Sequence, residues 1–244
     1  MEKYNIYWEK NKNNSSIVLP KRGIKSRIAI LKEVLKGKKV LHIGCSDWPD
    51  TGNKIKNNEL LHQYLINTAK TLYGIDKSEK GISTMLKNGI KNVFVGDIYK
   101  LCENKDLVDK NFDVLLVSEI MEHILNPGQA LISIKKYVLR TNPNCEIVFT
   151  VPNYHNFLFN TVYGLTCREA VNPDHKFYFS YRTFRNLVES CGYKVEDFYF
   201  VTYGKGAKSL KERIFIKLFG YFLQCMLPHL YFKCRLNNQD QNAF

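Results

Sequence analysis

The hydrophobic positions of this chain follow two alternating spacings between residues 23 and 151. Short apolar runs rich in β-branched residues alternate with longer stretches in which apolar residues recur every three or four positions. The first spacing is typical of strands and the second of amphipathic helices. Regular strand–helix alternation predicts a parallel sheet with helices on both faces, because each parallel connection crosses back over the sheet.

The limits of the predicted elements come from the residues that end each run. The predicted strands are 39–43, 71–75, 91–95, 112–117 and 145–151. The predicted helices are 23–36, 58–70, 78–88, part of 98–110, 128–140 and 180–191. Residues 49–57 are predicted as a polar loop, and 193–203 as strand-like sequence with room for a turn. The aromatic and Asn-rich stretch 152–179 interrupts the alternation.

Composition supports a folded globular protein and argues against several other classes. Of the 244 residues, 45% are hydrophobic and 24% are charged, which argues against disorder. The seven cysteines are odd in number and form no C-x-x-C pair, so we expect no zinc ribbon and no disulfide framework. With no apolar signal core at the N-terminus, the sequence predicts a reducing, cytoplasmic location.

The net charge of +13 is confined to the two ends of the chain. Residues 1–39 hold 11 basic and 3 acidic side chains, and residues 205–235 hold 7 basic and 1 acidic. The region between them holds 18 of each sign. This distribution predicts a neutral catalytic or binding core with basic ends that can meet an anionic surface. Lysines that serve only solubility would give the same pattern, so both interpretations stay open.

Three of the predicted strands end in residues suited to a nucleoside. The sequences are VLHIGCSD (40–47), YGIDKS (73–78) and FVGDI (94–98). Ligands of open α/β sheets bind beyond the carboxyl ends of the strands. The glycine of the first sequence lets the backbone approach a ligand closely. The acid of the second can accept hydrogen bonds from two ribose hydroxyls, and the acid of the third from an exocyclic amine.

A dinucleotide cofactor fits these strand ends poorly. Its phosphates need the turn G-x-G-x-x-G, in which the glycines allow the tight turn, the close approach of the pyrophosphate and the packing of the helix. Here the run is GCSDWP at 44–49, which keeps only the first glycine and places an acid and an indole near the diphosphate. We therefore do not expect a dehydrogenase.

A further motif gives the sequence a family resemblance. FDVLLVSEIMEHILNP (112–127) and HKFYFSYRTFRNLVESCGYKV (175–195) follow the three strand ends in order. Together they resemble class I S-adenosylmethionine-dependent methyltransferases, above all the small-molecule enzymes of the ubiquinone-biosynthesis and type 11 kind. The resemblance covers about 37–203. It implies a Rossmann-like, seven-stranded, mostly parallel sheet with helices on both faces and an antiparallel last strand.

The resemblance also implies how the chain divides. Residues 1–22 would be an N-terminal lead-in or lid, and residues 23–204 the methyltransferase domain. Within that domain, 152–179 would form an insertion on the acceptor side. Residues 205–244 would be a basic, partly apolar C-terminal extension.

Carried over residue by residue, the resemblance implies a site for S-adenosyl-L-methionine. The implied cofactor-binding residues are Gly44, Cys45, Ser46, Asp76, Lys77, Asp97, Ile98, Ser118 and Glu119. The first three would line the methionine part, the next four would hold ribose and adenine, and the last two would border the sulfonium. The sequence departs from the family pattern at His42, where an acid is usual, and at Ser46 and Trp48, where glycines are usual.

His123 is the candidate catalytic residue, as a base for an acceptor hydroxyl. The alternative is that His123 only bonds to a helix end. His155 and His175 lie in the predicted acceptor-side stretch and are weaker candidates for substrate contact. Because no H-x-x-x-H pair occurs among the histidines, we expect a mechanism without a metal.

Within residues 207–235, apolar residues dominate 214–232 but are interrupted by Lys217, Gln224, Pro228 and His229. That pattern is too broken for a transmembrane helix. It predicts either a helix packed on the domain or a second subunit, which we favour, or an amphipathic segment on an anionic membrane surface.

The sequence therefore predicts methyl transfer to a small or medium acceptor, with an oxygen of a sugar, glycan precursor or lipid-like metabolite as the expected target. A nucleic-acid methyltransferase is the second hypothesis, which the neutral central region and the absence of an N-P-P-Y motif disfavour. A non-catalytic module that has lost the cofactor is the third.

Overall fold

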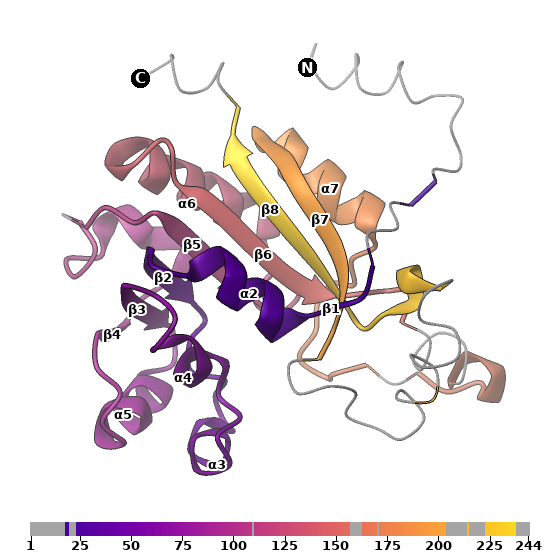
Figure 1. The fold of residues 1–244 in the computed structure, drawn as a ribbon, viewed down its shortest axis with the longest axis horizontal. Helices are drawn as coiled ribbons and strands as arrows, with labels where there is room; N and C mark the ends of the chain where they lie inside the picture. The colour runs from indigo at the N-terminus through magenta and orange to yellow at the C-terminus, as the bar shows by residue number, and fades with distance from the viewer. Residues whose placement is uncertain are drawn as a thin grey trace.

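A computed structural model describes residues 18–19, 23–108, 110–156, 163–169, 171–203, 214 and 223–237 of the chain. These residues form an eight-stranded sheet in the order β1-β7-β8-β6-β5-β2-β3-β4, with helices on both faces (Figure 1). Most of the predicted lead-in 1–22 and most of the predicted extension 205–244 lie outside the described residues. No helix among the described residues is long and apolar enough to cross a membrane.

The strands have the following bounds. They are β1 (Lys25–Ser26), β2 (Lys39–Ile43), β3 (Thr71–Asp76), β4 (Val93–Val95), β5 (Val114–Ser118), β6 (Glu146–Pro152), β7 (Tyr193–Thr202) and β8 (His229–Leu236). Strands β4, β3, β2, β5 and β6 are parallel neighbours, and β8 runs antiparallel to both β6 and β7. The parallel sheet and its antiparallel last strand, which the sequence predicted, are confirmed.

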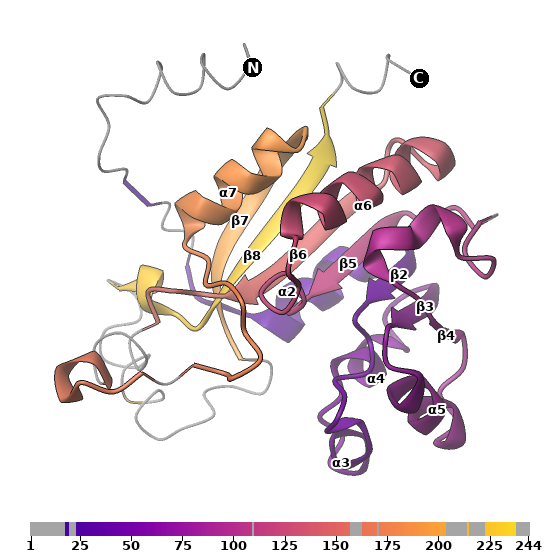
Figure 2. The ribbon, with the colours of Figure 1, turned by 180° about the vertical axis from the view of Figure 1, so that it is seen from behind.

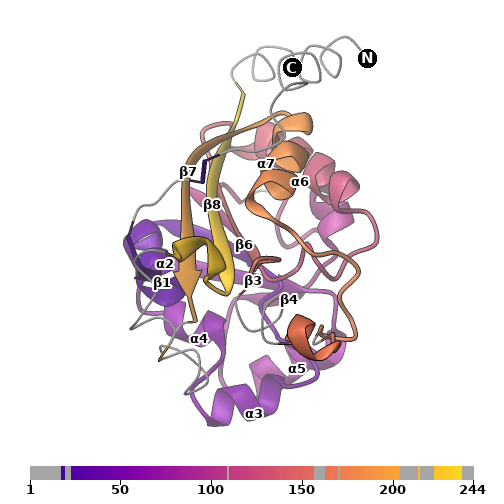
Figure 3. The ribbon, with the colours of Figure 1, turned by 90° about the vertical axis from the view of Figure 1, so that its right-hand side faces the viewer.

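The helices lie between the strands as the alternation predicted. The α-helices are α2 (Arg27–Leu35), α3 (Thr51–Lys56), α4 (Leu61–Leu65), α5 (Glu79–Lys87), α6 (Pro127–Thr141) and α7 (Tyr181–Ser190). Short 3₁₀ helices are η1 (Ile98–Glu103), η3 (Gly164–Thr166) and η4 (Gln224–Met226). Figures 2 and 3 show α6 and α7 together on one face of the sheet, with α2 on the other.

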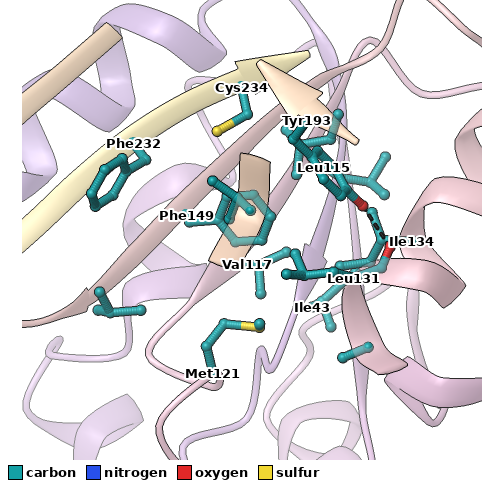
Figure 4. Close-up of a cluster of buried hydrophobic side chains, with 14 of the residues drawn as sticks. Ile43, Leu115, Val117, Met121, Leu131, Ile134, Phe149, Tyr193, Phe232 and Cys234 are labelled. Carbon is teal, nitrogen blue, oxygen red and sulfur yellow. Dashed lines mark hydrogen bonds between the residues drawn. The ribbon is translucent and has the colours of Figure 1, made fainter. Parts of the chain in front are cut away.

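The sheet separates two hydrophobic cores because side chains alternate along each strand. On β5, Leu115 and Val117 face α6 and α7, whereas Val114 and Leu116 face α2 and α4. The larger core is shown in Figure 4, where the Tyr193 hydroxyl donates to the carbonyl oxygen of Leu131 at 2.6 Å. The burial on both faces explains the continuous apolar runs of the central strands.

The C-terminal segment differs most from prediction. We expected a packed helix or a membrane-lying segment at 207–235, but residues 229–236 form β8 in the interior of the sheet. The sheet has eight strands instead of the predicted seven because the two-residue β1 pairs with β7 at its edge. A strand buried on both faces has no polar alternation, so its apolar run could not be distinguished from a buried helix.

Smaller differences concern element limits. The predicted loop 49–57 contains helix α3, and the predicted helix 58–70 shortens to α4. The predicted helix 23–36 begins at Arg27, because the Ser26 hydroxyl caps it by accepting from the backbone N–H of Ala29 at 3.0 Å. Residues 193–202 form one continuous strand with a bulge and contain no turn.

Candidate functional site

A cavity of about 470 Å³ opens at the carboxyl ends of β2 and β5. Its wall combines the turn after β2, the loop after β5, the start of α2, the start of β8 and part of the predicted acceptor-side stretch. The polar residues of the wall include Arg27, His42, Ser118, Glu119, Glu122, His123, Asn172, His175, Tyr178 and His229. This is the edge of the sheet where the sequence predicted ligand binding.

The turn after β2 approaches the cavity closely. Gly44 has φ +81° and its N–H donates to the carbonyl oxygen of Ile75 at 2.8 Å. A side chain here would be strained by the backbone and would overlap the Cδ1 atom of Ile120. Cys45 also lines the cavity, although it is only 1% exposed. The backbone conformation therefore favours glycine, and any larger residue would also have to displace the Ile120 side chain.

The acids at the next two strand ends accept hydrogen bonds from backbone amides. Asp76 accepts from the N–H of Ser46 at 3.0 Å and from the N–H of Ser78 at 2.9 Å, one bond on each carboxylate oxygen. Asp97 accepts from the N–H of Tyr99 at 3.0 Å. A carboxylate has about four acceptor positions, so Asp76 and Asp97 can each accept further hydrogen bonds.

The structure divides the predicted site residues into two groups. Those on the cavity wall are Gly44, Cys45, Ser118, Glu119 and His123. Those at the adjoining strand ends, outside that wall, are Ser46, Asp76, Lys77, Asp97 and Ile98. The side chain of Ser46 is fully buried and packs so closely on α5 that any side chain at Gly81 would overlap it.

Glu119 carries a negative charge on the cavity wall. It has φ +53°, lies 3.1 Å from Arg27 Nη1 through Oε1, and lies 3.1 Å from His229 Nδ1 through Oε2. Burial alone would raise the pKa of Glu119, but His229 and Arg27 hold this pKa well below its ordinary value. The ion pairs thus join β8 and α2 to the loop after β5.

Glu122 has the opposite electrostatic environment. Its side chain is buried, and neither carboxylate oxygen has a hydrogen-bond partner among the described residues. Burial, and next the charge of Glu119, raise the pKa of Glu122 well above its ordinary value. Its backbone oxygen accepts from the N–H of Lys176 at 2.7 Å, which draws the acceptor-side stretch against the loop.

His123 is oriented by a carboxylate. Its Nδ1 donates to Asp174 Oδ2 at 3.1 Å, and Lys176 Nζ lies 3.1 Å from the other oxygen of Asp174. The ring of His123 meets the ring of His175 edge to face, with centroids 4.6 Å apart. Burial, with a smaller contribution from His123, lowers the pKa of His175, so this imidazole is neutral at pH 7.

A second pair of histidines lies behind the wall. His42 Nδ1 and His62 Nδ1 are 3.2 Å apart, and the two rings are stacked. Burial, aided by the charge of Arg27, lowers the pKa of His42 to about 3. The pKa of His62 is lowered by burial as well. Both rings are therefore neutral, and one of them donates its Nδ1–H to the other.

Sequence reasoning missed four residues of this region: Arg27, His62, Glu122 and His229. Glu122 was inside the motif SEIMEH but had no assigned role. The other three lie on segments predicted as helix or extension, and only the tertiary structure brings them to the strand ends. No spacing in the sequence signals that convergence.

Comparison with known proteins places this geometry in a methyltransferase fold. The structure of a TehB-like S-adenosylmethionine-dependent methyltransferase from Corynebacterium glutamicum is similar, with a TM-score of 0.51, 12% identity and 97% of each chain covered. A possible histamine N-methyltransferase from Thermotoga maritima gives a TM-score of 0.55 at 14% identity, covering 97% of this chain and 96% of that one.

A methyltransferase from Archaeoglobus fulgidus gives a TM-score of 0.52 at 17% identity, covering 96% of this chain and 99% of that one. At these identities the likeness shows the fold alone, which is that of S-adenosylmethionine-dependent methyltransferases. No curated protein matches the sequence. The family model described as methionine biosynthesis protein MetW matches residues 25–162, and the chain therefore belongs to the MetW family.

Proposed function

We propose that this protein is an S-adenosylmethionine-dependent methyltransferase that acts on an oxygen of a small or medium acceptor. The observation that carries the proposal is a pair of buried nitrogens on the cavity wall beside Gly44. Arg27 Nε and His42 Nε2 both lack a hydrogen-bond partner among the described residues. Buried polar groups are nearly always hydrogen-bonded, so two such groups on a cavity wall are available to a bound ligand.

These two nitrogens fit the amino-acid end of the cofactor. The Arg27 guanidinium suits a carboxylate, because it is always charged and offers several donors. His42 stands where the resembling family has an acid for the cofactor's amino group. If His42 donates Nδ1–H to His62, its Nε2 becomes an acceptor and can take over that role. The departure from the family pattern is then compatible with binding.

The adenosine end would lie across the neighbouring strand ends. There Asp76 keeps acceptor positions for the ribose hydroxyls and Asp97 for the adenine amine, with Lys77 and Ile98 beside them, as the sequence resemblance implies. Asp76 is fixed by the two amides of Ser46 and Ser78, so its carboxylate is already oriented. Preorganisation of this kind favours binding because little ordering remains to be done.

The reaction would take place where the two ends meet, near Ser118 and Glu119. The methyl group moves in line from the sulfonium to the acceptor oxygen: the C–S bond breaks, the C–O bond forms, and the electron pair stays on sulfur. The acceptor oxygen also has to lose its proton. On the cavity wall, His123 is the residue that the sequence predicted for this role, and its ring faces His175 and Glu122.

The acceptor side of the cavity is polar and aromatic. Asn172, His175 and Tyr178 come from the stretch 152–179, and Tyr203 and Pro228 complete this part of the wall. These residues combine ring faces with hydrogen-bonding groups, as a sugar or another hydroxylated metabolite requires. This composition supports a hydroxylated acceptor, and the sequence resemblance to small-molecule enzymes points in the same direction.

Calorimetry with S-adenosylhomocysteine and S-adenosylmethionine tests the proposal. The unmodified protein should bind both, and Arg27→Ala should weaken binding at least tenfold because a charged partner of the carboxylate is lost. Lys25→Ala, two residues away on the same segment, is the matched control and should bind as before. Absence of heat with both compounds would contradict the proposed function, and unchanged binding in Arg27→Ala would contradict the carboxylate assignment.

A further inference from the structure

Glu122 has no role in binding the cofactor as proposed above. It is 1% exposed, lies on the cavity wall, and offers two carboxylate oxygens that nothing in the described part of the chain satisfies. A buried carboxylate without partners is costly, and it persists only if a proton or a cation compensates it. Either a proton or a cation can therefore compensate the carboxylate of Glu122.

The neighbours of Glu122 favour a cation. One ligand atom from each of Glu122, His123 and His175 can be chosen so that all three lie within 4.8 Å of one another. Two imidazoles and one carboxylate form a donor set that suits divalent transition metals and leaves coordination positions open. The three side chains come from two segments, the loop after β5 and the acceptor-side stretch, which the bond from Lys176 N–H to Glu122 O holds together.

The surroundings also orient the imidazoles as metal ligands need. His123 Nδ1 donates to Asp174 Oδ2, which leaves Nε2 as the nitrogen with a lone pair. His175 Nδ1 is buried and has no hydrogen-bond partner among the described residues. Both rings therefore have a nitrogen available for coordination. Glu119 is engaged with Arg27 and His229, so it stays outside this set.

We propose that Glu122, His123 and His175 bind a divalent cation at the acceptor side of the cavity, and that this cation holds the acceptor hydroxyl for methyl transfer. The second part rests on the proposed function, whereas cation binding does not. The proposal replaces two sequence-based expectations, namely a mechanism without a metal and His123 as the base.

A cation at this position would help the acceptor hydroxyl to lose its proton. A hydroxyl bound to a divalent cation has a lowered pKa, so its proton can pass to solvent at neutral pH. With its proton gone, the acceptor oxygen would form a bond to the methyl carbon as the C–S bond breaks with its electron pair, which would leave S-adenosylhomocysteine and the methylated acceptor. Acceptors that present two neighbouring oxygens would fit best, because both can coordinate the cation.

Titration with Mn²⁺, followed by the electron paramagnetic resonance of the free ion and by calorimetry, tests the proposal. Mn²⁺ is the probe because carboxylates and imidazoles bind it, whereas the seven free thiols of this chain would compete for softer metals. The unmodified protein should bind one Mn²⁺ per chain at this site. Glu122→Gln and His175→Asn should each weaken that binding at least tenfold.

Matched variants separate the site from general effects. Glu103→Gln and His155→Asn remove an exposed acid and an exposed histidine, and both should bind Mn²⁺ as the unmodified protein does. Asp174→Asn should weaken binding by a smaller factor, since it only orients His123. Circular dichroism shows whether each variant is folded. If Glu122→Gln does not fold, a folded His175→Asn is enough to test the site.

Two outcomes would overturn the proposal: no Mn²⁺ binding by the unmodified protein, or binding that neither Glu122→Gln nor His175→Asn weakens. The same preparations are then titrated with S-adenosylhomocysteine. Binding of that compound without Mn²⁺ binding would refute the cation and leave the methyltransferase assignment in place. Mn²⁺ binding without the nucleoside would refute the proposed function instead.

Discussion

The two sides of the site satisfy their polar groups in different ways. At the ends of β3 and β4, Asp76 and Asp97 accept hydrogen bonds from backbone amides of their own turns, and Asp76 accepts another from Ser46 in the turn after β2. At the ends of β2 and β5, buried nitrogens of Arg27 and His42 and the carboxylate of Glu122 have no such partner among the described residues. The two acids of the first side are thus held by the chain's own backbone, whereas these groups of the second side are not.

This difference predicts that the two sides contribute differently to the stability of the free protein. Groups that are satisfied internally stabilise the fold whether or not a ligand is bound. Groups left unsatisfied cost stability, and a fold retains them where a ligand compensates that cost. Substitutions on the two sides should therefore have opposite effects on the free protein.

The largest effect is expected where the turn after β2 meets the loop after β5. Gly44→Ala places a methyl group against Ile120 at φ +81°, so it combines overpacking with backbone strain. Gly89→Ala is the matched control, because Gly89 has φ +80° but open space around it. Gly44→Ala should lower the free energy of unfolding by about 1–3 kcal/mol more than the control, as measured by urea denaturation. Equal losses would show that Ile120 does not pack on this turn.

A smaller effect is expected from exchanging one carboxylate on each side. Asp76→Ala removes the acceptor of two backbone amides and should lower the free energy of unfolding by about 1–3 kcal/mol, besides weakening cofactor binding at least tenfold. Glu122→Gln removes an unsatisfied buried acid and should leave the metal-free protein at least as stable as before. Denaturation of both variants without added metal measures this, and a large loss in Glu122→Gln would contradict the contrast between the two sides.

The sequence could place some of these residues at strand ends but could not bring the others to them, for a physical reason. Asp76 and Asp97 directly follow apolar strands, so local sequence places them at the edge of a parallel sheet. Arg27, His62 and His229 come from helices α2 and α4 and from β8, and the tertiary packing alone brings them near Gly44. Strand β8 was missed because its residues are buried on both faces.

The elements of the fold likewise divide into those that follow from local sequence and those that depend on packing. Strands β2 to β6 and the helices between them follow from a repeating local pattern. The limits of α3 and α4 do not, because short helices of five or six residues depend on packing more than on sequence. The contribution of α2 to the site likewise depends on its Ser26 cap, which fixes where Arg27 begins the helix.

The last effect depends on pH and concerns the histidine pair behind the wall. Burial holds the pKa of His42 at about 3. Below pH 6.5, His42 therefore binds a proton in the unfolded chain but not in the folded chain. The free energy of unfolding should therefore fall by about 1.4 kcal/mol for each pH unit below 6.5, down to the folded pKa, for this one residue.

Urea denaturation at pH 7.5 and pH 5.0 checks this. His42→Gln should lose less stability between the two pH values than the unmodified protein, whereas His155→Gln, which changes an exposed histidine, should lose as much. His62 and Arg27 face His42 and are retained in both variants, and burial, the larger cause, still lowers the pKa of His62 in each. Identical losses in all three proteins would mean that His42 is not held neutral.

The most direct test of the central claim is a crystal structure of the complex with S-adenosylhomocysteine. We predict ribose hydroxyls on Asp76, the adenine amine on Asp97, and the homocysteine carboxylate on Arg27, with the sulfur atom directed toward Glu122 and His175. A nucleoside bound elsewhere, or a homocysteine tail directed away from Arg27 and His42, would contradict the account.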